Sequence, residues 1–230
     1  MSVFRLSDAL IFPPPQLADS EGLLAVGGDL SVERLKLAYS MGIFPWFNDG
    51  DPILWWSPDP RLLMPLDGFY ISSRLARTIR QGRFLCTFDE NFDAVIECCA
   101  TVRGPRRDGT WITDAMQEAY INLHRAGFAH SVEVWLENRL VGGMYGVAIG
   151  SAFFGESMFS LESNASKIAF AALMERLNAW GFTIMDCQMP TPHLLRLGGR
   201  VVRRERFLAK LEKALNKPTR RHSWTDGTAN

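Results

Sequence analysis

The sequence has few of the side chains that build metal centres and disulfide frameworks. It contains four cysteines, at positions 86, 98, 99 and 187, and four histidines in 230 residues. No pair of cysteines has the spacing of zinc ligands, so the sequence predicts no metal site and no metal cofactor. We interpret the thiols as reduced, which is typical of a cytoplasmic protein.

Long hydrophobic runs and an excess of charge of one sign are also missing. No apolar run reaches the ~18 residues that span a membrane, and the N-terminal segment lacks the features of a signal peptide. We therefore expect no membrane partner. Basic and acidic residues each total 25, so the formal net charge is zero. A nucleic-acid partner would need a local basic patch, because the whole protein supplies no net positive field.

The most apolar stretch, residues 140–188, is the centre of the predicted fold. Residues 140–149 and 152–160 are expected to form a β-hairpin that turns at Gly150. A helix is expected to follow from a cap at Ser163, with apolar residues at helical spacing, and to end at Gly181. The segment that follows, FTIMDCQMP, is predicted to be a strand that Pro190 ends.

Three polar side chains lie on these predicted strands. Glu156 is inside the hairpin, where a carboxylate is costly to bury unless it has a partner or a function. Asp186 and Gln188 are two residues apart on the later strand, so they should share a face, whereas Cys187 should point into the core. These residues are the candidates for chemistry.

The order of the predicted elements indicates an α+β fold with a mixed β-sheet, which resembles the GNAT acyltransferase fold. The phosphate loop of that fold, Gln/Arg-x-x-Gly-x-Gly/Ala, does not precede the helix; the sequence there is SMFSLESNASK. A coenzyme A pyrophosphate would have no glycine-rich nest, so no such cofactor is expected. We predict a small N-terminal domain (1–62) and a GNAT-like catalytic domain (63–230), with a mobile tail from about 217.

Aromatic residues are concentrated near the N-terminus. Five of them fall within thirteen positions, namely Phe44, Trp46, Phe47, Trp55 and Trp56. They can form a small core, or one can be a platform for a nucleobase, because base stacking contributes about 1–3 kcal/mol per base. Trp46 is the preferred platform because it lies between two turns.

Basic residues are concentrated in two places. Arg74, Arg77, Arg80 and Arg83 recur in steps of three on a predicted helix, and no acidic residue lies between positions 70 and 87. This stripe is either a solvated face or a set of phosphate contacts. Arg103, Arg106 and Arg107 form a basic loop before Trp111, which is a second stacking candidate.

Several segments together resemble the bacterial leucyl/phenylalanyl-tRNA–protein transferase family, over residues 22 to about 199. The matching segments are GLLAVGGDLS, AYSMGIFPWF, DPILWWSPDPR, GTWIT, HSVEVW, LVGGMYGVAIG, FFGESMFS, NASK and DCQ. The resemblance implies transfer of Leu or Phe, with Met as a further candidate, from aminoacyl-tRNA to proteins whose N-terminal residue is Arg or Lys. The products would be degraded by the N-end rule, and no coenzyme A or metal would be needed.

The resemblance also implies roles for individual residues. Asp186 and Gln188 would be catalytic, with positioning favoured over proton abstraction for Asp186. Glu156 would hold the cationic acceptor or anchor Asn164 and Ser166 structurally. Trp46 and Trp111 would contact the terminal adenosine, and the four arginines would contact the tRNA.

The donor side chain would need an apolar pocket. The candidates are Met144, Phe153 and Met158, with Phe170 and Leu173 behind them; without the resemblance, all five would be interpreted as core. Methionines repack easily, which suits a site that accepts both Leu and Phe. Simple alternation places Phe153 on the face of the strand opposite to that of Glu156 and Met158. A β-bulge near Gly155 would bring Phe153 and Met158 to the same face; otherwise Phe153 belongs to the core.

One departure and two other functions remain open. Arg196 stands where the family commonly has Ser. The chain could instead be a tRNA-dependent ligase of the peptidoglycan-precursor type, although such proteins usually have two of these domains. A non-catalytic tRNA-binding module would use only the tryptophans and arginines. We expect a monomer.

Overall fold

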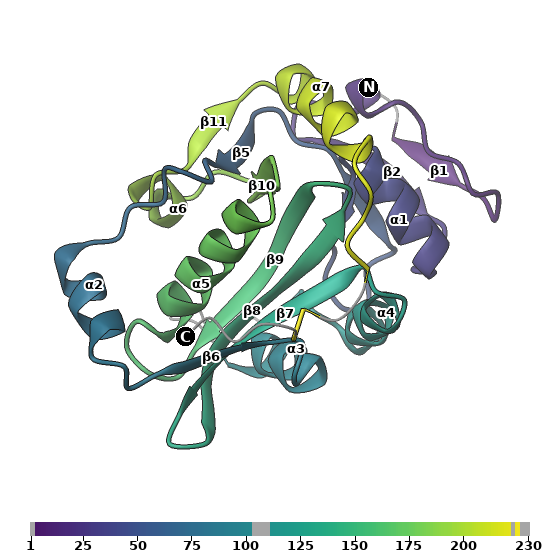
Figure 1. Cartoon of the computed structure of the whole chain (residues 1–230). Helices are drawn as coiled ribbons and strands as arrows, with labels where there is room; N and C mark the ends of the chain where they lie inside the picture. Colours follow the sequence, from purple (N-terminus) through teal and green to yellow (C-terminus); the bar gives the residue numbers. More distant parts are fainter. Residues whose placement is uncertain (1–2, 103–110, 222–223, 226–230) are drawn as a thin grey trace.

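Two β-sheets of unequal size run through the protein (Figure 1), whose computed structural model describes residues 3–102, 111–221 and 224–225. The smaller sheet has the strand order β1–β2–β4–β3, and the larger one has the order β11–β5–β10–β9–β8–β7–β6. The strands are β1 (Phe4–Leu6), β2 (Leu23–Gly27), β3 (Phe44–Pro45), β4 (Leu54–Trp56), β5 (Arg61–Met64), β6 (Leu85–Phe88), β7 (Ala129–Leu136), β8 (Arg139–Ile149), β9 (Ala152–Ser160), β10 (Ile184–Asp186) and β11 (Arg200–Val202).

Helices cover both faces of the larger sheet. The helices of the described chain are α1 (Val32–Ser40), α2 (Ser73–Arg80), α3 (Phe92–Thr101), α4 (Asp114–Arg125), α5 (Ala165–Ala179), α6 (Pro192–Arg196) and α7 (Arg204–Leu215), with a short 3-10 helix at Pro15–Leu17. Helix α5 lies on one face, and α3 and α4 lie on the other (Figure 1). This arrangement confirms the predicted α+β class with a mixed sheet, because β9 and β10 are parallel and the other neighbours are antiparallel.

Polar caps fix the starts of most helices, as the sequence predicts. The hydroxyls of Ser31, Ser72 and Thr113 accept hydrogen bonds from the first turns of α1, α2 and α4. The predicted cap of α5 is wrong. Asn164, not Ser163, precedes the helix, and it has φ of 73° with no side-chain cap bond.

The hairpin β8–β9 contains the expected bulge. Tyr145 pairs with Ser157 and Gly146 pairs with Gly155, so Glu156 has no residue opposite it. The extra residue shifts the alternation of side chains by one. Phe153 and Met158 consequently belong to the same apolar cluster, under α5.

One apolar core joins the two sheets. It includes Leu24 and Trp55 from the smaller sheet, Tyr145 and Phe154 from the larger one, and Phe207 from α7. The larger sheet begins at Arg61, because β5 pairs with β10 and β11. The chain thus passes from one sheet to the other between Trp56 and Arg61, slightly before the expected boundary at residue 62.

The described part of the segment after residue 217 contains a buried tryptophan, and the mobility expected for this segment stays a prediction. Trp224 is fully buried in the cluster under α5, and its ring stacks on His130 at 4.1 Å. Its backbone N–H donates to Asp89 Oδ2 at 3.2 Å, and its carbonyl accepts from Arg176. One aromatic side chain therefore fixes the end of the described chain.

None of the helices in the described part of the chain has the length and apolar character needed to cross a membrane. Nor do three potential metal-binding side chains converge anywhere among the described residues.

Candidate active site

A cavity of about 300 Å³ opens where β9 and β10 separate. Strand β10 pairs with β9 only over Ala152–Phe154. Beyond Phe154, the bulge bends β9, whereas the backbone after Asp186 stays hydrogen bonded to Leu62 of β5. Residues from β8, β9, α5, β10 and α6 line the opening, namely Met144, Gly155, Glu156, Ser157, Met158, Phe170, Met185, Cys187, Gln188, Thr191, His193 and Leu194.

Glu156, the bulged residue, forms the polar wall of this cavity. Its Oε2 accepts from the Tyr120 hydroxyl at 3.0 Å, and its Oε1 accepts from Gln188 Nε2 at 2.8 Å. The Tyr120 hydroxyl is in turn hydrogen bonded to that of Tyr39. Burial raises the pKa of Glu156 to about 7; the two tyrosines and Arg61 act against this rise, and Asp186 adds to it. This carboxyl can therefore gain or lose a proton near neutral pH.

The position of Asp186 on a strand beside the cavity predicts a side chain that faces the cavity, but the structure places it in the interior. It is fully buried and is not among the described cavity-lining residues. Its oxygens accept from Arg61, at 2.6 Å to Nη2 and at 2.9 and 3.1 Å to Nε. Arg61 also donates to the Gly42 carbonyl at 3.2 Å. Asp186 is thus paired with the buried guanidinium of Arg61. It contacts the cavity only through neighbouring residues that line it, such as Gln188.

Gln188 connects the two carboxylates. Its backbone N–H donates to Asp186 Oδ1 at 2.9 Å, while its side-chain amide donates to Glu156. Its φ of 61° is in the left-handed region, which a glutamine seldom occupies and which costs about 1 kcal/mol or more. The Asp186 bond stabilises this conformation, which brings the amide to the cavity wall.

The predicted donor pocket is partly reproduced. Met144, Met158 and Phe170 line the cavity, and Met185 adds a third methionine. Phe153 and Leu173 are buried in the same apolar cluster behind the wall. Cys187 lines the cavity, whereas the sequence indicated that it would point into the core.

The two tryptophans lie outside the described lining of the cavity. Trp46 is 37% exposed and contacts Trp56 edge to face at 5.6 Å. Trp111 is half-buried against the core shared by the two sheets. Trp46 follows α1, which carries Tyr39, and Trp111 precedes α4, which carries Tyr120. Both tryptophans are therefore close in sequence to the tyrosine pair behind Glu156, and their contact with adenosine stays a prediction.

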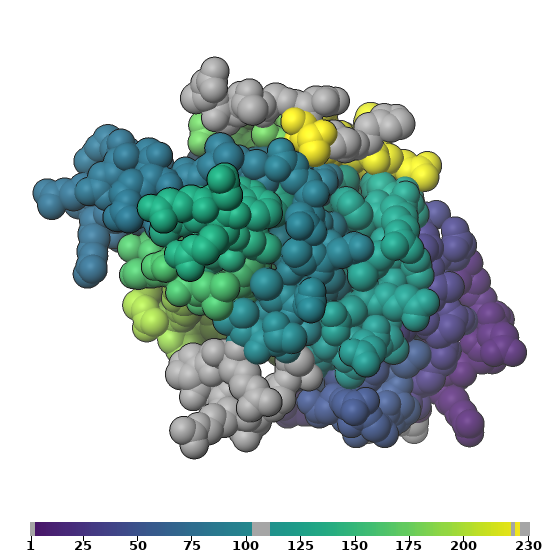
Figure 2. Space-filling view, turned by 90° about the horizontal axis from the view of Figure 1, so that it is seen from below, coloured from purple at the N-terminus to yellow at the C-terminus, as the bar shows by residue number. Residues whose placement is uncertain are grey.

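The arginine stripe is fully solvent-accessible. Arg74, Arg77 and Arg80 are exposed on α2, whereas Arg83 follows the helix, after Gly82 with its φ of 63°. Helix α2 buries only Leu75 and stands out from the body, on the side opposite the N-terminal strands (Figure 2). The basic loop Arg103–Arg107 lies outside the described residues.

Sequence reasoning did not identify Arg61, Tyr39, Tyr120 or Met185 as members of the site. Arg61 and Asp186 are 125 positions apart, so no local pattern connects them. The one available signal was an arginine at the end of an apolar, proline-rich segment, where burial would require an acidic partner.

Comparison with known proteins agrees with the architecture. Residues 63–212 match the family "Leucyl/phenylalanyl-tRNA protein transferase", and residues 28–59 match the N-terminal domain of the same family. Proteins named leucyl/phenylalanyl-tRNA–protein transferase are similar over nearly the whole chain. The one from Myxococcus xanthus is 51% identical over 100% of this chain and 99% of its own. The one from Desulfatibacillum aliphaticivorans is 55% identical over 98% of this chain and 97% of its own.

Solved structures resemble the chain more distantly. L-PGS from Bacillus licheniformis has a TM-score of 0.40 and 13% identity, and the match covers 75% of this chain and 56% of that one. The sequence comparisons establish the relationship: the chain belongs to the leucyl/phenylalanyl-tRNA–protein transferase family.

Proposed function

We propose that the protein transfers Leu or Phe from the 3′ end of an aminoacyl-tRNA to the α-amine of a protein. Family membership supports this proposal. The observation that carries it is the cavity between β9 and β10, whose walls of Met144, Met158 and Phe170 are apolar and whose polar side is the Glu156–Gln188 pair. The apolar part suits a Leu or Phe side chain, and the polar pair suits the reacting amine and ester.

The reaction is aminolysis of an ester. The nitrogen of the acceptor attacks the ester carbonyl, a C–N bond forms, and the bond from the carbonyl carbon to the ribose oxygen breaks. The amine must be neutral to attack, and its unperturbed pKa is about 8. The released ribose oxygen needs a proton, so one proton passes from the nitrogen to that oxygen in each turnover.

We assign the transfer of this proton to Glu156. With a pKa of about 7, its carboxylate can accept the proton that the attacking nitrogen loses and then donate it to the ribose oxygen as the carbon–oxygen bond breaks. The hydroxyls of Tyr120 and Tyr39 lie on its far side and keep its orientation fixed. The proton-accepting and proton-donating roles thus belong to one carboxyl.

Gln188 and Asp186 then act as a positioning unit. One N–H of the Gln188 amide donates to Glu156, and its second N–H is left to donate to the oxyanion. Asp186 fixes the Gln188 backbone and is itself fixed by Arg61. Asp186 is buried, does not line the cavity and accepts hydrogen bonds from Arg61 on both oxygens, so we assign it to orientation.

The finer parts of the proposal concern the partners. Trp46 and Trp111 stack on the terminal adenosine, and the exposed arginines of α2, together with Arg83, contact the acceptor stem. Proteins with N-terminal Arg or Lys are the acceptors, and their products enter N-end-rule degradation. The protein acts as a monomer in the cytoplasm.

Radiolabelled Phe-tRNA mixed with peptides that begin with Arg or with Ala tests the proposal. We expect label to move to the Arg peptide and not to the Ala peptide. Transfer to a peptidoglycan precursor would favour the ligase alternative, and retention of tRNA without any transfer would favour a binding module.

A further inference from the structure

Three basic side chains lie on the cavity lining or within one helical turn of it. Lys167 is three residues before the lining residue Phe170 on α5, and Arg196 is three residues after His193 on α6. His193 lines the cavity beside Thr191 and Leu194. Its pKa is lowered, first by partial burial and then by the positive charges of Lys167 on α5 and Arg196 on α6. Among the described residues, none of the three forms an ion pair. We call Lys167, His193 and Arg196 the rim cluster.

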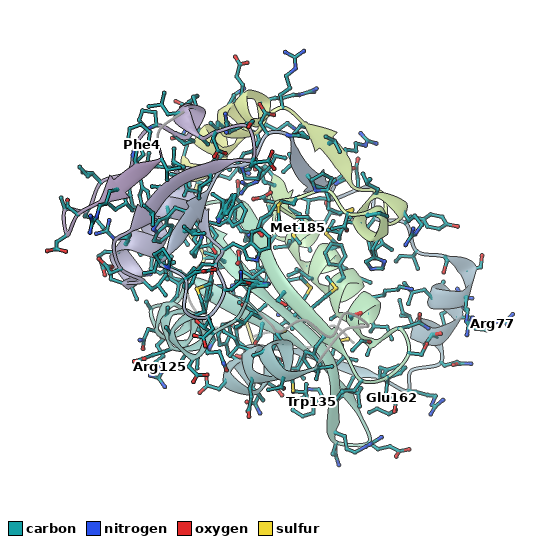
Figure 3. The ribbon with its side chains drawn as sticks, turned by 180° about the vertical axis from the view of Figure 1, so that it is seen from behind. Phe4, Arg77, Arg125, Trp135, Glu162 and Met185 are labelled. Atoms are coloured by element: carbon teal, nitrogen blue, oxygen red, sulfur yellow. The ribbon has the colours of Figure 1, made fainter. Side chains whose placement is uncertain are left out.

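The rim cluster adjoins the segment that leads to α2. The Leu197 carbonyl, directly after α6, accepts from the backbone N–H of Tyr70 at 2.9 Å. Gly198 packs so closely on this segment that an added Cβ would lie 2.3 Å from the Gly68 carbonyl oxygen. Helices α6 and α2 are on the same side of the molecule (Figure 1). Arg77 of α2 lies at one edge, and Arg125 of α4 lies on the opposite side (Figure 3).

We propose that the rim cluster binds the phosphodiester on the 5′ side of the terminal adenosine of the donor tRNA. The inference rests on the proposed function, since it assumes that the donor side chain fills the cavity between Met144, Met158 and Phe170. In that position the ribose that carries the ester lies at the rim. Its 5′ phosphate is then the nearest negative charge of the RNA.

The charge distribution favours RNA over an acidic peptide. The rim cluster and the α2 arginines form two basic groups on one side of the molecule, joined by the segment that contains Gly68 and Tyr70. A polyanion can contact the rim cluster and the α2 arginines at the same time. An acidic side chain next to the acceptor amine would contact only the rim cluster. The rim cluster therefore fixes the register of the last nucleotide, and α2 holds the stem.

An inhibitor pair tests this assignment. The non-transferable amide 3′-phenylalanylamino-3′-deoxyadenosine, with and without a 5′-phosphate, competes with Phe-tRNA for transfer to an Arg peptide. For the unaltered protein, we expect the 5′-phosphate to lower the inhibition constant about threefold or more, as for a solvent-accessible charge contact. In Arg196→Ala and in Lys167→Ala, the 5′-phosphate should lower the inhibition constant by a smaller factor. In the double variant, the two compounds should have the same inhibition constant.

The controls separate this inference from the function on which it rests. Arg125→Ala removes an exposed arginine on the far side and should keep the full phosphate effect. The compound without phosphate should bind all variants equally, which shows that their cavities are intact. Equal inhibition by both compounds in the unaltered protein would overturn the inference, as would a phosphate effect that survives in the double variant.

Two other results have distinct meanings. If Arg196→Ala instead raised the KM only for acceptor peptides with an acidic second residue, the rim cluster would meet the protein substrate and the inference would be wrong. Failure of the unaltered protein to transfer Phe from tRNA without any inhibitor would contradict the proposed function itself.

Discussion

Glu156 and Asp186 are carboxylates on neighbouring parallel strands, yet their partners give them different chemistry. Asp186 meets a buried guanidinium, whereas Glu156 meets two hydroxyls and an amide. Neutral donors stabilise a carboxylate less than a guanidinium does, so burial dominates at Glu156 and raises its pKa. The residue that faces the cavity is thus the one able to exchange a proton.

Replacing Glu156 with Gln should change both stability and turnover. The folded protein binds this proton more tightly than the unfolded chain does, because the pKa rises from 4.5 to about 7 on folding. The stability contributed by the carboxyl is therefore fully present below pH 4.5 and is lost as the pH rises through 7. Glu156→Gln lacks this dependence, so the free energy of unfolding of the unaltered protein should fall by about 3 kcal/mol relative to the variant between about pH 5 and pH 8.

Turnover provides the second measurement for this variant. We expect kcat of Glu156→Gln to fall by about a hundredfold or more, since the amide cannot accept the proton. In the unaltered protein kcat should rise with pH through about 7. A variant that kept its turnover would show that Glu156 has only a structural role, through its bonds to Tyr120 and Gln188.

Variants of the Arg61–Asp186 pair should change stability and turnover independently of each other. Arg61→Met leaves Asp186 buried without its partner and should lower the free energy of unfolding by about 3–5 kcal/mol. The double variant Arg61→Met with Asp186→Leu replaces both charges and should recover most of that loss. Its turnover should stay low, because the Gln188 N–H has lost its acceptor.

Urea denaturation and steady-state kinetics would measure the two effects. A double variant with normal kcat would contradict the positioning role. The sequence placed Asp186 and Gln188 together and favoured positioning for Asp186, but it did not identify Arg61, 125 positions away, as the partner of Asp186.

At the level of elements, α2 is a basic helix held by little apolar contact. Arg77→Glu with Arg80→Glu should weaken tRNA binding and reduce the slope of log K against log salt by about 2, since about one unit is lost for each phosphate contact. With saturating tRNA, kcat should stay within a few fold. Filter binding at several salt concentrations would measure the slope, and Arg5→Glu with Arg125→Glu is the matched control. An equal loss of tRNA affinity in both double variants would indicate a nonspecific charge effect.

Most elements follow from sequence patterns, and the exceptions have physical causes. The hairpin, its bulge and the helices α1, α2 and α4 were predictable from alternation, caps and glycines. Helix α3 and strand β6 were not identified, although Asn91 caps α3 in the usual way. Both segments mix apolar with polar residues. Strand β6 has only four residues, and its long-range pairing with β7 selects the strand.

On the scale of the whole molecule, the shared core should make the protein unfold as one unit. Leu35 of α1 is fully buried in that core, beside residues of both sheets. Leu35→Ala should cost about 2–5 kcal/mol and lower the Tm by roughly 5–15 °C. Tryptophan fluorescence, which reports on indoles beside both sheets, and far-UV circular dichroism should shift together. Two separate transitions would show that the two parts are independent.

The polar composition of the segment after position 217 does not indicate that Trp224 is buried. The residues after position 217 are mostly polar, and this favoured a mobile tail. Burial of Trp224 against His130, Phe153 and Trp180 outweighs the polar residues around it. A single aromatic residue in a polar segment has no periodicity, so only the three-dimensional fit to its pocket identifies it.

The three methionines of the cavity are positions where oxidation would change the donor pocket. Met144, Met158 and Met185 line the space that we assign to the donor side chain. Oxidation to the sulfoxide would turn each thioether into a polar group within an apolar wall. Peroxide stress should then weaken selection of Leu and Phe before it affects the fold, and sulfoxide reductases would be able to restore it.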